Sequence, residues 1–325
     1  MVEPSIYAPE DGSPVTIADV RRAARRISPY VHRTPVITSG TIDRLTGTSV
    51  AFKCENLQKV GAFKARGALN AVLGMADTTA ARGVVTHSSG NHGQALAYAA
   101  AIRGVRCWVV MPDHAPQVKV DAVRGYGAEV VFCAHAERDQ VASAVATETG
   151  AAFVHPFDDP MVIAGQGTAA LEFLEQVPTL DVLITPIGGG GLLSGTTVAA
   201  ATISPTTTVI GAEPERVDDA ARSLATGVRQ PAVPRPDTLA DGLLTGIGTL
   251  PFEILTAAGT EIITVDEDTI RAAATLHLER MKLVVEPSGA TGLAAVMTAG
   301  ERLRGASVGV LISGGNTDLS WYRPG

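Results

Sequence analysis

A lysine set between two glycines is the first feature of the sequence that could do chemistry. Gly61 lies three residues before Lys64, Gly67 lies three residues after it, and Phe63 precedes it directly. A lysine amine can form a Schiff base with a carbonyl cofactor, and an aromatic neighbour can pack against a flat ring. Taken by itself, the stretch is better explained as an ordinary basic turn before a helix that starts at about Arg66.

Four consecutive glycines (residues 188–191) join a predicted strand at 182–186 to a predicted helix that starts at Leu192. Glycines at a helix N-terminus let backbone N–H groups converge on an anion, so the loop suits a phosphate. No register gives the dinucleotide pattern G-x-G-x-x-G, and no Lys-Ser/Thr pair follows as in a P-loop. The alternative is a flexible entry to the helix. Because a run of glycines loses much conformational entropy on folding, we favour the phosphate site.

Two further turns follow predicted strands and carry polar side chains. The segment 86–93 is Thr-His-Ser-Ser-Gly-Asn-His-Gly and opens a helix, so its hydroxyls, amide and N–H groups can bind a carboxylate. The alternative is a simple N-cap by Ser88 or Ser89, with His92 merely packed. The whole cluster at the end of a strand favours a ligand site. The second turn places Ser313 before two glycines, where a plain turn is the simpler explanation.

A short acidic loop offers oxygen ligands for a divalent cation. Glu213 lies at one end, and Asp218 and Asp219 lie at the other. Carboxylate and carbonyl oxygens are the ligands that Mg²⁺ and Ca²⁺ prefer. On these residues alone, the simpler explanation is that the two aspartates favour the N-terminus of the helix that follows.

Together the lysine, the glycine loop, the polar turn and the strand-end serine form one set. They describe a phosphate-bearing aldehyde held as a Schiff base, with an amino-acid substrate held by its carboxylate. Pyridoxal 5'-phosphate meets that description.

Such turns must be positioned by strands that alternate with helices. The hydrophobic pattern predicts strands at 50–53, 83–87, 106–111, 129–133, 152–155, 182–186, 208–212, 261–265 and 307–312. It predicts helices from Thr16 to Pro29 and at 68–75, 94–102, 117–126, 138–149, 167–176, 192–201, 218–226, 266–279 and 288–299. This alternation implies an α/β fold whose parallel-rich twisted sheets carry helices on both faces. Two series suggest two α/β units, and the Pro/Gly-rich residues 227–250 are the least regular part.

The composition argues against some classes of function. The 325 residues carry a formal net charge of −7, and the 26 lysines and arginines are scattered apart from arginine pairs on one short helix, so no nucleic-acid surface is expected. No apolar run reaches the length of a membrane span. Cys107 and Cys133 lie in apolar, strand-like runs, and no C-x-x-C pair occurs. Buried free thiols and a cytoplasmic location are therefore expected.

The motifs resemble those of fold-type II pyridoxal-phosphate enzymes, specifically the serine/threonine dehydratase and serine racemase group. The matching segments run in family order over nearly the whole chain, at residues 53–56, 63–68, 88–93, 188–191, 213–214 and 313–316. The resemblance implies a tryptophan synthase β-like architecture. In it, residues 1–75 and 160–325 form a large cofactor-binding domain, and residues 76–159 form a small mobile domain that can close over a substrate.

The resemblance also implies roles for particular residues. Lys64 is the implied Schiff-base lysine with Phe63 against the cofactor ring, and Asn91 and Ser313 are the implied partners of the ring hydroxyl and the pyridine nitrogen. The implied phosphate cradle is Gly188, Gly189, Gly190, Gly191 and Leu192. The implied substrate-binding residues are Ser88, Ser89, Asn91, His92 and Arg138. A Mg²⁺ or Ca²⁺ site is implied at Glu213, Asp219 and the carbonyl of Val217, which reverses the preference stated above.

The implied reaction is β-elimination from a hydroxy-amino acid such as L-serine or L-threonine, giving a 2-oxo acid and ammonia. Ser89 introduces alternatives, because racemisation needs a second acid/base on the face opposite Lys64. Serine racemases and hydroxyaspartate dehydratases carry serine here, whereas biosynthetic threonine dehydratases usually carry alanine. A bifunctional serine racemase and a 3-hydroxyaspartate ammonia-lyase therefore stay open. A β-replacement enzyme and a non-catalytic cofactor-binding protein are further alternatives. The family suggests a homodimer.

The sequence departs from the family near the lysine. Val60 and Ala62 stand where the family usually has hydroxyl side chains, so the substrate preference is open. The chain ends soon after Ser313, so we expect no isoleucine-sensing regulatory domain and no inhibition by isoleucine.

Overall fold

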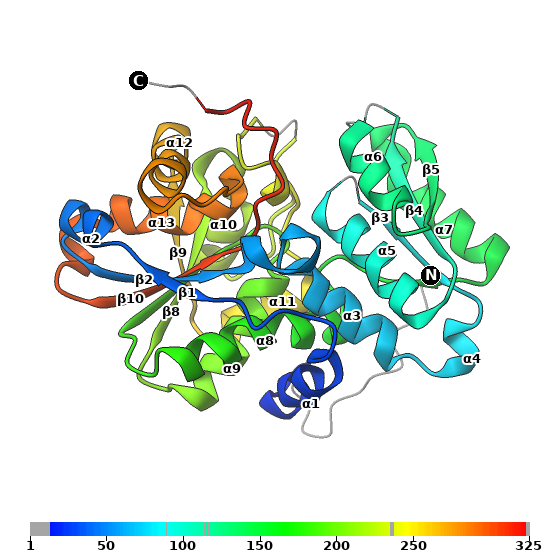
Figure 1. The fold of residues 1–325 in the computed structure, drawn as a ribbon, viewed down its shortest axis with the longest axis horizontal. Helices are drawn as coiled ribbons and strands as arrows, with labels where there is room; N and C mark the ends of the chain where they lie inside the picture. Colours follow the sequence, from blue (N-terminus) through cyan, green and yellow to red (C-terminus); the bar gives the residue numbers. More distant parts are fainter. Residues whose placement is uncertain (1–13, 89, 114, 116, 235–236, 323–325) are drawn as a thin grey trace.

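Two separate sheets organise the chain (Figure 1). The computed structural model describes residues 14–322 except 89, 114, 116 and 235–236. The larger sheet has the strand order β1-β2-β10-β7-β8-β9, and the smaller has the order β5-β4-β3-β6. Neighbouring strands run parallel except β1, which is antiparallel to β2. The expected parallel-rich α/β fold is confirmed.

The strands are β1 (Val36–Thr38), β2 (Ser49–Cys54), β3 (Val84–His87), β4 (Cys107–Pro112), β5 (Glu129–Cys133), β6 (Ala152–Phe153), β7 (Val182–Pro186), β8 (Thr208–Pro214), β9 (Glu261–Val265) and β10 (Ser307–Ile312). The helices are α1 (Ile17–Ile27), α2 (Gly40–Thr46), α3 (Lys64–Gly74), α4 (Asp77–Ala80), α5 (Asn91–Arg103), α6 (Gln117–Arg124), α7 (Arg138–Thr149), α8 (Pro160–Gln176), α9 (Gly191–Ile203), α10 (Asp219–Thr226), α11 (Thr249–Ala257), α12 (Glu267–Leu276) and α13 (Pro287–Ala299). A π-helical turn, His277–Met281, follows α12.

Helices cover both faces of the larger sheet (Figure 1). Successive residues of its central strands point to opposite faces. On β7, Ile184 belongs to the apolar cluster shared with α12 and α13, whereas its neighbour Leu183 packs with Phe173 of α8 and Ala199 of α9. Burial on both faces explains why these strands are continuous apolar runs rather than alternating ones.

The smaller sheet is also covered on both faces. Val84 and Val109 pack with Leu96 of α5, whereas Val85 and Val110 face the cluster that holds α7. All its strands lie within residues 84–153. Helix α3 lies at the junction, because it packs against α5 of the smaller unit and against α8 of the larger one. The domain boundaries at residues 75/76 and 159/160 stay a prediction.

Several element boundaries differ from the prediction. Helix α8 begins at Pro160 rather than 167, because Asp159 accepts hydrogen bonds from the backbone N–H groups of Met161 and Val162 and caps it. Helix α3 begins at Lys64 rather than 68. Helix α12 ends at Leu276 rather than 279, because the π-helical turn begins at the next residue. The prediction missed β1, α2, α4 and α11.

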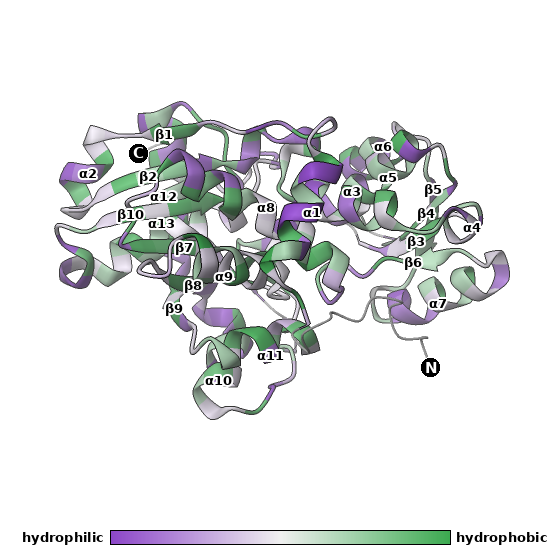
Figure 2. Ribbon diagram, turned by 90° about the horizontal axis from the view of Figure 1, so that it is seen from below, coloured by the Kyte–Doolittle hydropathy of each residue, from purple (hydrophilic) through white to green (hydrophobic). Residues whose placement is uncertain are grey.

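The surface, the cysteines and the helix lengths add three further observations. In Figure 2 the helix α1 is strongly hydrophilic, consistent with its two arginine pairs. Cys54 and Cys107 are buried free thiols, whereas Cys133, expected to be buried, is only half-buried. Within the described ranges, no helix combines the length and the apolar character needed to cross a bilayer.

Candidate active site

Lys64 is the first residue of α3 and lies where the two units meet. Its Nζ donates a hydrogen bond of 2.8 Å to the carbonyl oxygen of Pro156. Desolvation of the amine lowers the pKa of Lys64 to about 8. Among the residues that the structure describes, no carboxylate forms an ion pair with it. A lysine held in this way has a much larger neutral fraction near neutral pH than an ordinary lysine, which favours a nucleophile or a general base.

The glycine loop faces the residue that follows Pro156. A Cβ added at Gly189 would lie 2.2 Å from the ring of Phe157, and a Cβ at Gly191 would lie 3.0 Å from the Phe157 carbonyl oxygen. Gly190 has φ +88°, in the left-handed region that favours glycine. The loop therefore requires glycine for close backbone approach, and it ends at the N-terminus of α9, as a phosphate cradle does.

The segment before Lys64 runs beside the turn after β10. The backbone N–H of Phe63 donates to the carbonyl oxygen of Ser313 at 3.0 Å, and Ala62 forms an isolated β-bridge with Gly314. Phe63 also packs against the apolar cluster that contains Leu192, the residue directly after the last glycine of the loop. The structure thus brings together the lysine stretch, the glycine loop and the strand-end serine, which are far apart in the sequence.

The turn after β3 leads into α5 without a side-chain cap among the described residues. The N-cap residue of α5 is Gly90, which has no side chain to accept from the first turn of the helix. The Ser88 hydroxyl instead accepts a hydrogen bond from the N–H of Gly90 at 3.2 Å. His92 is buried with its Nε2 3.3 Å from the Val154 carbonyl oxygen, and burial together with nearby Lys64 lowers its pKa. The alternative of a serine N-cap is not seen for Ser88, and Ser89 lies outside the described residues.

Asn91 contacts a glutamate that the sequence reasoning missed. Its Nδ2 donates to Glu286 Oε1 at 2.8 Å, and its Oδ1 accepts from Asn316 Nδ2 at 2.8 Å. Burial, with a contribution from nearby Asp241, raises the pKa of Glu286 to about 8. In the sequence, Glu286 ends an apolar run and precedes a proline at a helix start, which resembles an ordinary helix entry. The role expected of Asn91 toward a ring hydroxyl stays a prediction.

Arg138 is the first residue of α7, and it lies near the turn that carries Ser88. The charge of Arg138 is close enough to His87, the residue before Ser88, to help burial lower the pKa of that histidine. His87 Nε2 in turn lies 3.3 Å from Asp139 Oδ1. Arg138 therefore lies near the polar turn, and its role at the far end of a substrate stays a prediction.

The acidic loop follows β8, which is the neighbour of β7, the strand before the glycine loop. The two oxygens of Glu213 accept hydrogen bonds from the N–H groups of Ala220 and Ala221 at 2.9 and 2.8 Å, and Asp219 Oδ2 accepts from Ile247 N–H at 2.8 Å. Burial, together with the neighbouring aspartates, raises the pKa of Glu213 to about 8. Glu213 thus accepts from the first turn of α10, and its role as a ligand of Mg²⁺ or Ca²⁺ stays a prediction. No group of three or more His, Cys, Asp or Glu side chains is arranged for a metal in the described ranges.

The model of the pyridoxal-phosphate dependent enzyme family matches residues 27–314. The chain belongs to this family. Serine racemase from Dictyostelium discoideum is 49% identical over 311 residues, which cover 94% of this chain and 96% of the relative. β-Hydroxyaspartate dehydratase from Paracoccus denitrificans is 47% identical over 306 residues, with coverage of 94% and 97%. The crystal structure of threonine deaminase from T.th. has a TM-score of 0.90 at 46% identity and covers 95% of this chain and 100% of that one.

The family identifies the protein as an enzyme and pyridoxal phosphate as its cofactor, and the site fits this group. The desolvated Lys64 amine suits the cofactor aldehyde. The glycine loop has no room for side chains and ends at a helix N-terminus, which suits the phosphate. Both features contact the same short segment. The Lys64 amine donates to the Pro156 carbonyl oxygen, and the glycine loop packs against Phe157. Neither residue was singled out from the sequence, because nothing in the local pattern of 155–158 indicates which segment lies between the lysine and the loop.

Proposed function

We propose that the enzyme catalyses β-elimination from a small hydroxy-amino acid, such as L-serine or L-threonine, to give a 2-oxo acid and ammonia. The observation that carries this proposal is the Lys64 amine, whose pKa is lowered to about 8 and which donates to Pro156, next to the Phe157 that packs against the glycine loop. The relatives with dehydratase, deaminase and racemase activity support it, because all these names describe chemistry at the Cα of an amino acid.

The residues of the chain divide the work as follows. Pyridoxal phosphate supplies an electron-withdrawing group that acidifies the Cα proton of the substrate. Lys64 takes that proton at Nζ as a general base. Ser88, Asn91 and the N–H groups at the start of α5 orient the substrate carboxylate. Loss of the Cα–H and Cβ–O bonds releases water, and hydrolysis of the product gives the 2-oxo acid and ammonia. Phe63 packs on the cofactor ring and excludes water.

The experiment is a 2-oxo acid release assay over a panel of hydroxy-amino acids with the cofactor-loaded enzyme. Lys64→Ala should reduce the rate by at least about a thousandfold, because the general base is lost. Lys59→Ala, in the same stretch, should retain the rate within about twofold. Equal losses in both variants, or a wild-type enzyme inert to the whole panel, would contradict the proposal and favour a non-catalytic cofactor-binding protein.

Two alternative reactions have specific support. The serine racemase relative and the β-hydroxyaspartate dehydratase relative are similarly close. The sequence carries Ser89, which we propose as the acid/base on the face opposite Lys64. Arg138, beside His87, supports a substrate with a second carboxylate. Chiral analysis of residual serine decides the first alternative, because Ser89→Ala should abolish D-serine formation while elimination persists. A wild-type enzyme that forms no D-serine removes racemisation, and a strong preference for 3-hydroxyaspartate supports the second alternative.

We infer that the enzyme is a homodimer and is cytoplasmic. Leu57 and Val284 are exposed apolar residues on neighbouring segments, since Asn56 Nδ2 donates to the Val284 carbonyl oxygen at 3.1 Å. Exposed apolar neighbours of this kind are typical of subunit contacts. The free thiols of Cys54 and Cys107 suit a reducing compartment. Sedimentation should give twice the chain mass, and a Leu57→Glu, Val284→Glu double variant should give a monomer.

We also propose that Mg²⁺ or Ca²⁺ binds at Glu213, Asp219 and the carbonyl of Val217. The raised pKa of both carboxyl groups supports the proposal, because it reflects desolvated oxygens close to one another and to Asp218, which a divalent cation would stabilise in the charged form. A connection to the cofactor site runs through the backbone. Asp219 accepts from Ile247, and the next residue, Gly248, donates to the Gly189 carbonyl oxygen at 3.1 Å.

A further inference from the structure

A buried ionic network lies behind Lys64 and is separate from the groups that face the cofactor. Its centre is Arg66, which forms one bidentate ion pair with Glu55, at 2.7 and 2.8 Å, and a second bidentate pair with Glu172, at 2.8 and 2.9 Å. Lys53 completes the network through Glu172 at 2.9 Å and the Thr34 carbonyl oxygen at 2.9 Å. Lys53, Glu55 and Arg66 are fully buried. The network therefore holds two cations and one carboxylate fully away from water, and the side chain of Glu172 is 15% exposed.

Net stabilisation is a poor explanation for such a network. Desolvation of buried charges offsets most of their mutual attraction, so apolar residues of the same shape often serve stability equally well. A guanidinium in bidentate ion pairs adds fixed geometry, because both carboxylates must lie in the plane of its N–H donors. The network therefore fixes the position of whatever carries Arg66.

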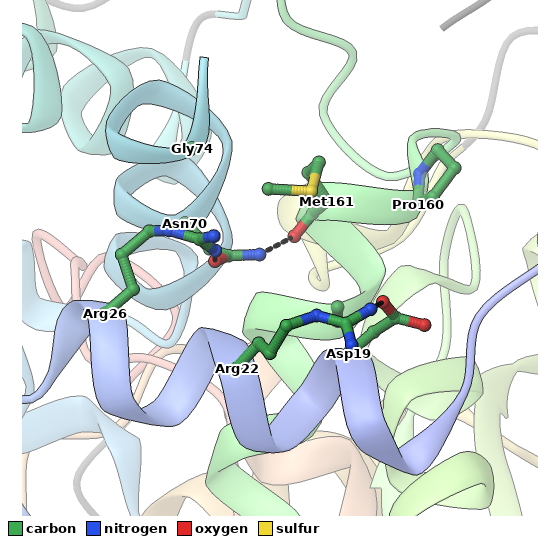
Figure 3. Close-up of a pocket in the computed structure, with 8 residues that line it drawn as sticks. Asp19, Arg22, Arg26, Asn70, Gly74, Pro160 and Met161 are labelled. Carbon is green, nitrogen blue, oxygen red and sulfur yellow. Dashed lines mark hydrogen bonds and ion pairs between the residues drawn. The ribbon is translucent and has the colours of Figure 1, made fainter. Parts of the chain in front are cut away.

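Arg66 is carried by the first turn of α3, two residues after Lys64. Its partners come from the segment after β2 (Glu55) and from the C-terminal half of α8 (Glu172). The network thus fixes the start of the lysine helix against α8. Further along α3, Asn70 repeats the connection: its Nδ2 donates to the Met161 carbonyl oxygen at 2.7 Å, beside a cavity of about 210 Å³ between α1, α3 and α8 (Figure 3).

Helix α8 connects in turn to the helix that carries the glycine loop. A Cβ added at Gly165 would lie 2.6 Å from Gly67 Cα of α3, and a Cβ added at Gly167 would lie 2.7 Å from the Gly195 carbonyl oxygen of α9. The backbones of α3, α8 and α9 are therefore in direct contact at these points, with no flexible side chains between them. Any shift of α3 against α8 changes the distance from Lys64 to the glycine loop at the start of α9.

We propose that Arg66 is a positioning residue, which sets the Lys64 amine at the correct distance from the glycine loop by fixing α3 to α8. This inference rests on the role proposed for Lys64 toward the cofactor. It makes no use of the substrate, so it can be tested by cofactor binding alone.

The test compares Arg66→Lys with the matched control Lys53→Met. Arg66→Lys keeps the positive charge but loses the planar set of N–H donors that makes the bidentate ion pairs. Lys53→Met removes the other cation, lies outside α3 and leaves Glu172 paired with Arg66. Cofactor-free protein is titrated with pyridoxal phosphate, and thermal unfolding is recorded in parallel. We expect a lower Tm in both variants. The Kd for pyridoxal phosphate should rise about tenfold or more in Arg66→Lys and less than about twofold in Lys53→Met, because a small misplacement of a reacting group has a large effect.

The outcomes separate positioning from a merely structural role. If the Kd rises equally in both variants, or is unchanged in Arg66→Lys, the proposal is wrong. If Arg66→Lys does not fold, the balanced variant Glu55→Gln, Arg66→Met leaves one cation and one carboxylate, and it must show the same rise in Kd. In the cofactor-loaded variants, kcat should fall about ten- to a hundredfold while KM changes little. An enzyme without elimination activity would contradict the proposed function but leave the cofactor titration interpretable.

Discussion

A histidine sealed in the core of the larger unit predicts how stability depends on pH. His277 is fully buried in the π-helical turn, and its ring packs edge-on against Phe52 with the centroids 5.1 Å apart. Nδ1 contacts the sulfur of Met281 at 3.3 Å, and Nε2 has no hydrogen-bond partner in the described ranges. With no acceptor for a second proton, desolvation lowers the pKa of His277 to about 3.

The magnitude follows from proton linkage. The unfolded chain binds a proton on this histidine below about pH 6.5, whereas the folded protein does so only below about pH 3. The unfolded state therefore binds more protons between these values, so acid favours unfolding. The stability is complete above about pH 6.5 and is lost as the pH falls. Each pH unit is worth about 1.36 kcal/mol, which gives a loss of about 2 kcal/mol from His277 between pH 7.5 and pH 5.

The variant His277→Leu isolates this contribution. At pH 7.5 its unfolding free energy should lie within about 1 kcal/mol of wild type, because removal of an unsatisfied nitrogen offsets the lost ring contact. At pH 5 it should be more stable than wild type by about 2 kcal/mol. Urea unfolding followed by tryptophan fluorescence, to which Trp321 in the same apolar cluster as Phe52 contributes, measures both values. His32→Leu, an exposed position, is the control. A difference between His277→Leu and wild type that is the same at the two pH values would refute the reasoning.

Three further predictions concern the site. Gly189→Ala should raise the Kd for pyridoxal phosphate about tenfold or more, because its Cβ would lie 2.2 Å from the Phe157 ring; Gly40→Ala, with its nearest neighbour at 3.6 Å, should have no effect in the same titration. The rate at which pyridoxal phosphate binds the cofactor-free protein should rise with pH as the Lys64 amine loses its proton around a pKa of about 8, and a flat profile from pH 6.5 to 9 would contradict this. Mg²⁺ or Ca²⁺ should raise the Tm of wild type but not of Glu213→Gln, and an equal rise in both would remove the cation site.

The strands were predictable because their burial on both faces leaves continuous apolar runs. The run at 307–312 gave both ends of β10 correctly. Helix α8 shows where this reasoning stops. Its first turns contain Pro160, Gly165 and Gly167, which locally resemble a loop. The structure shows that the two glycines are needed for helix-to-helix contact, with Gly67 and Gly195 as their partners. Only the tertiary neighbours distinguish a packing glycine from a turn glycine.

The candidate active site could likewise be predicted only in part from the sequence. The three glycine turns were identified because each follows a strand and opens a space for a ligand, and the chemistry of a phosphate, a carboxylate and an amine can be inferred from the residue types. Glu286 and Phe157 were missed because their importance lies in what they contact. Glu286 reaches Asn91 across 195 residues, and Phe157 fills the space left by Gly189. No local pattern encodes either contact.

The departures from the family at Val60 and Ala62 have a structural setting. Val60 has φ +55°, a conformation that is strained for a β-branched residue. Its carbonyl accepts a hydrogen bond of 2.7 Å from Asn316 Nδ2, which also reaches Asn91 at 2.8 Å. The strained residue is therefore fixed by the same amide that contacts the first residue of α5. Because Val60 is also buried in the apolar cluster that contains α5, its side chain contributes packing that offsets part of the strain. The backbone of the lysine stretch is thus connected, through Asn316, both to the turn after β10 and to the start of α5.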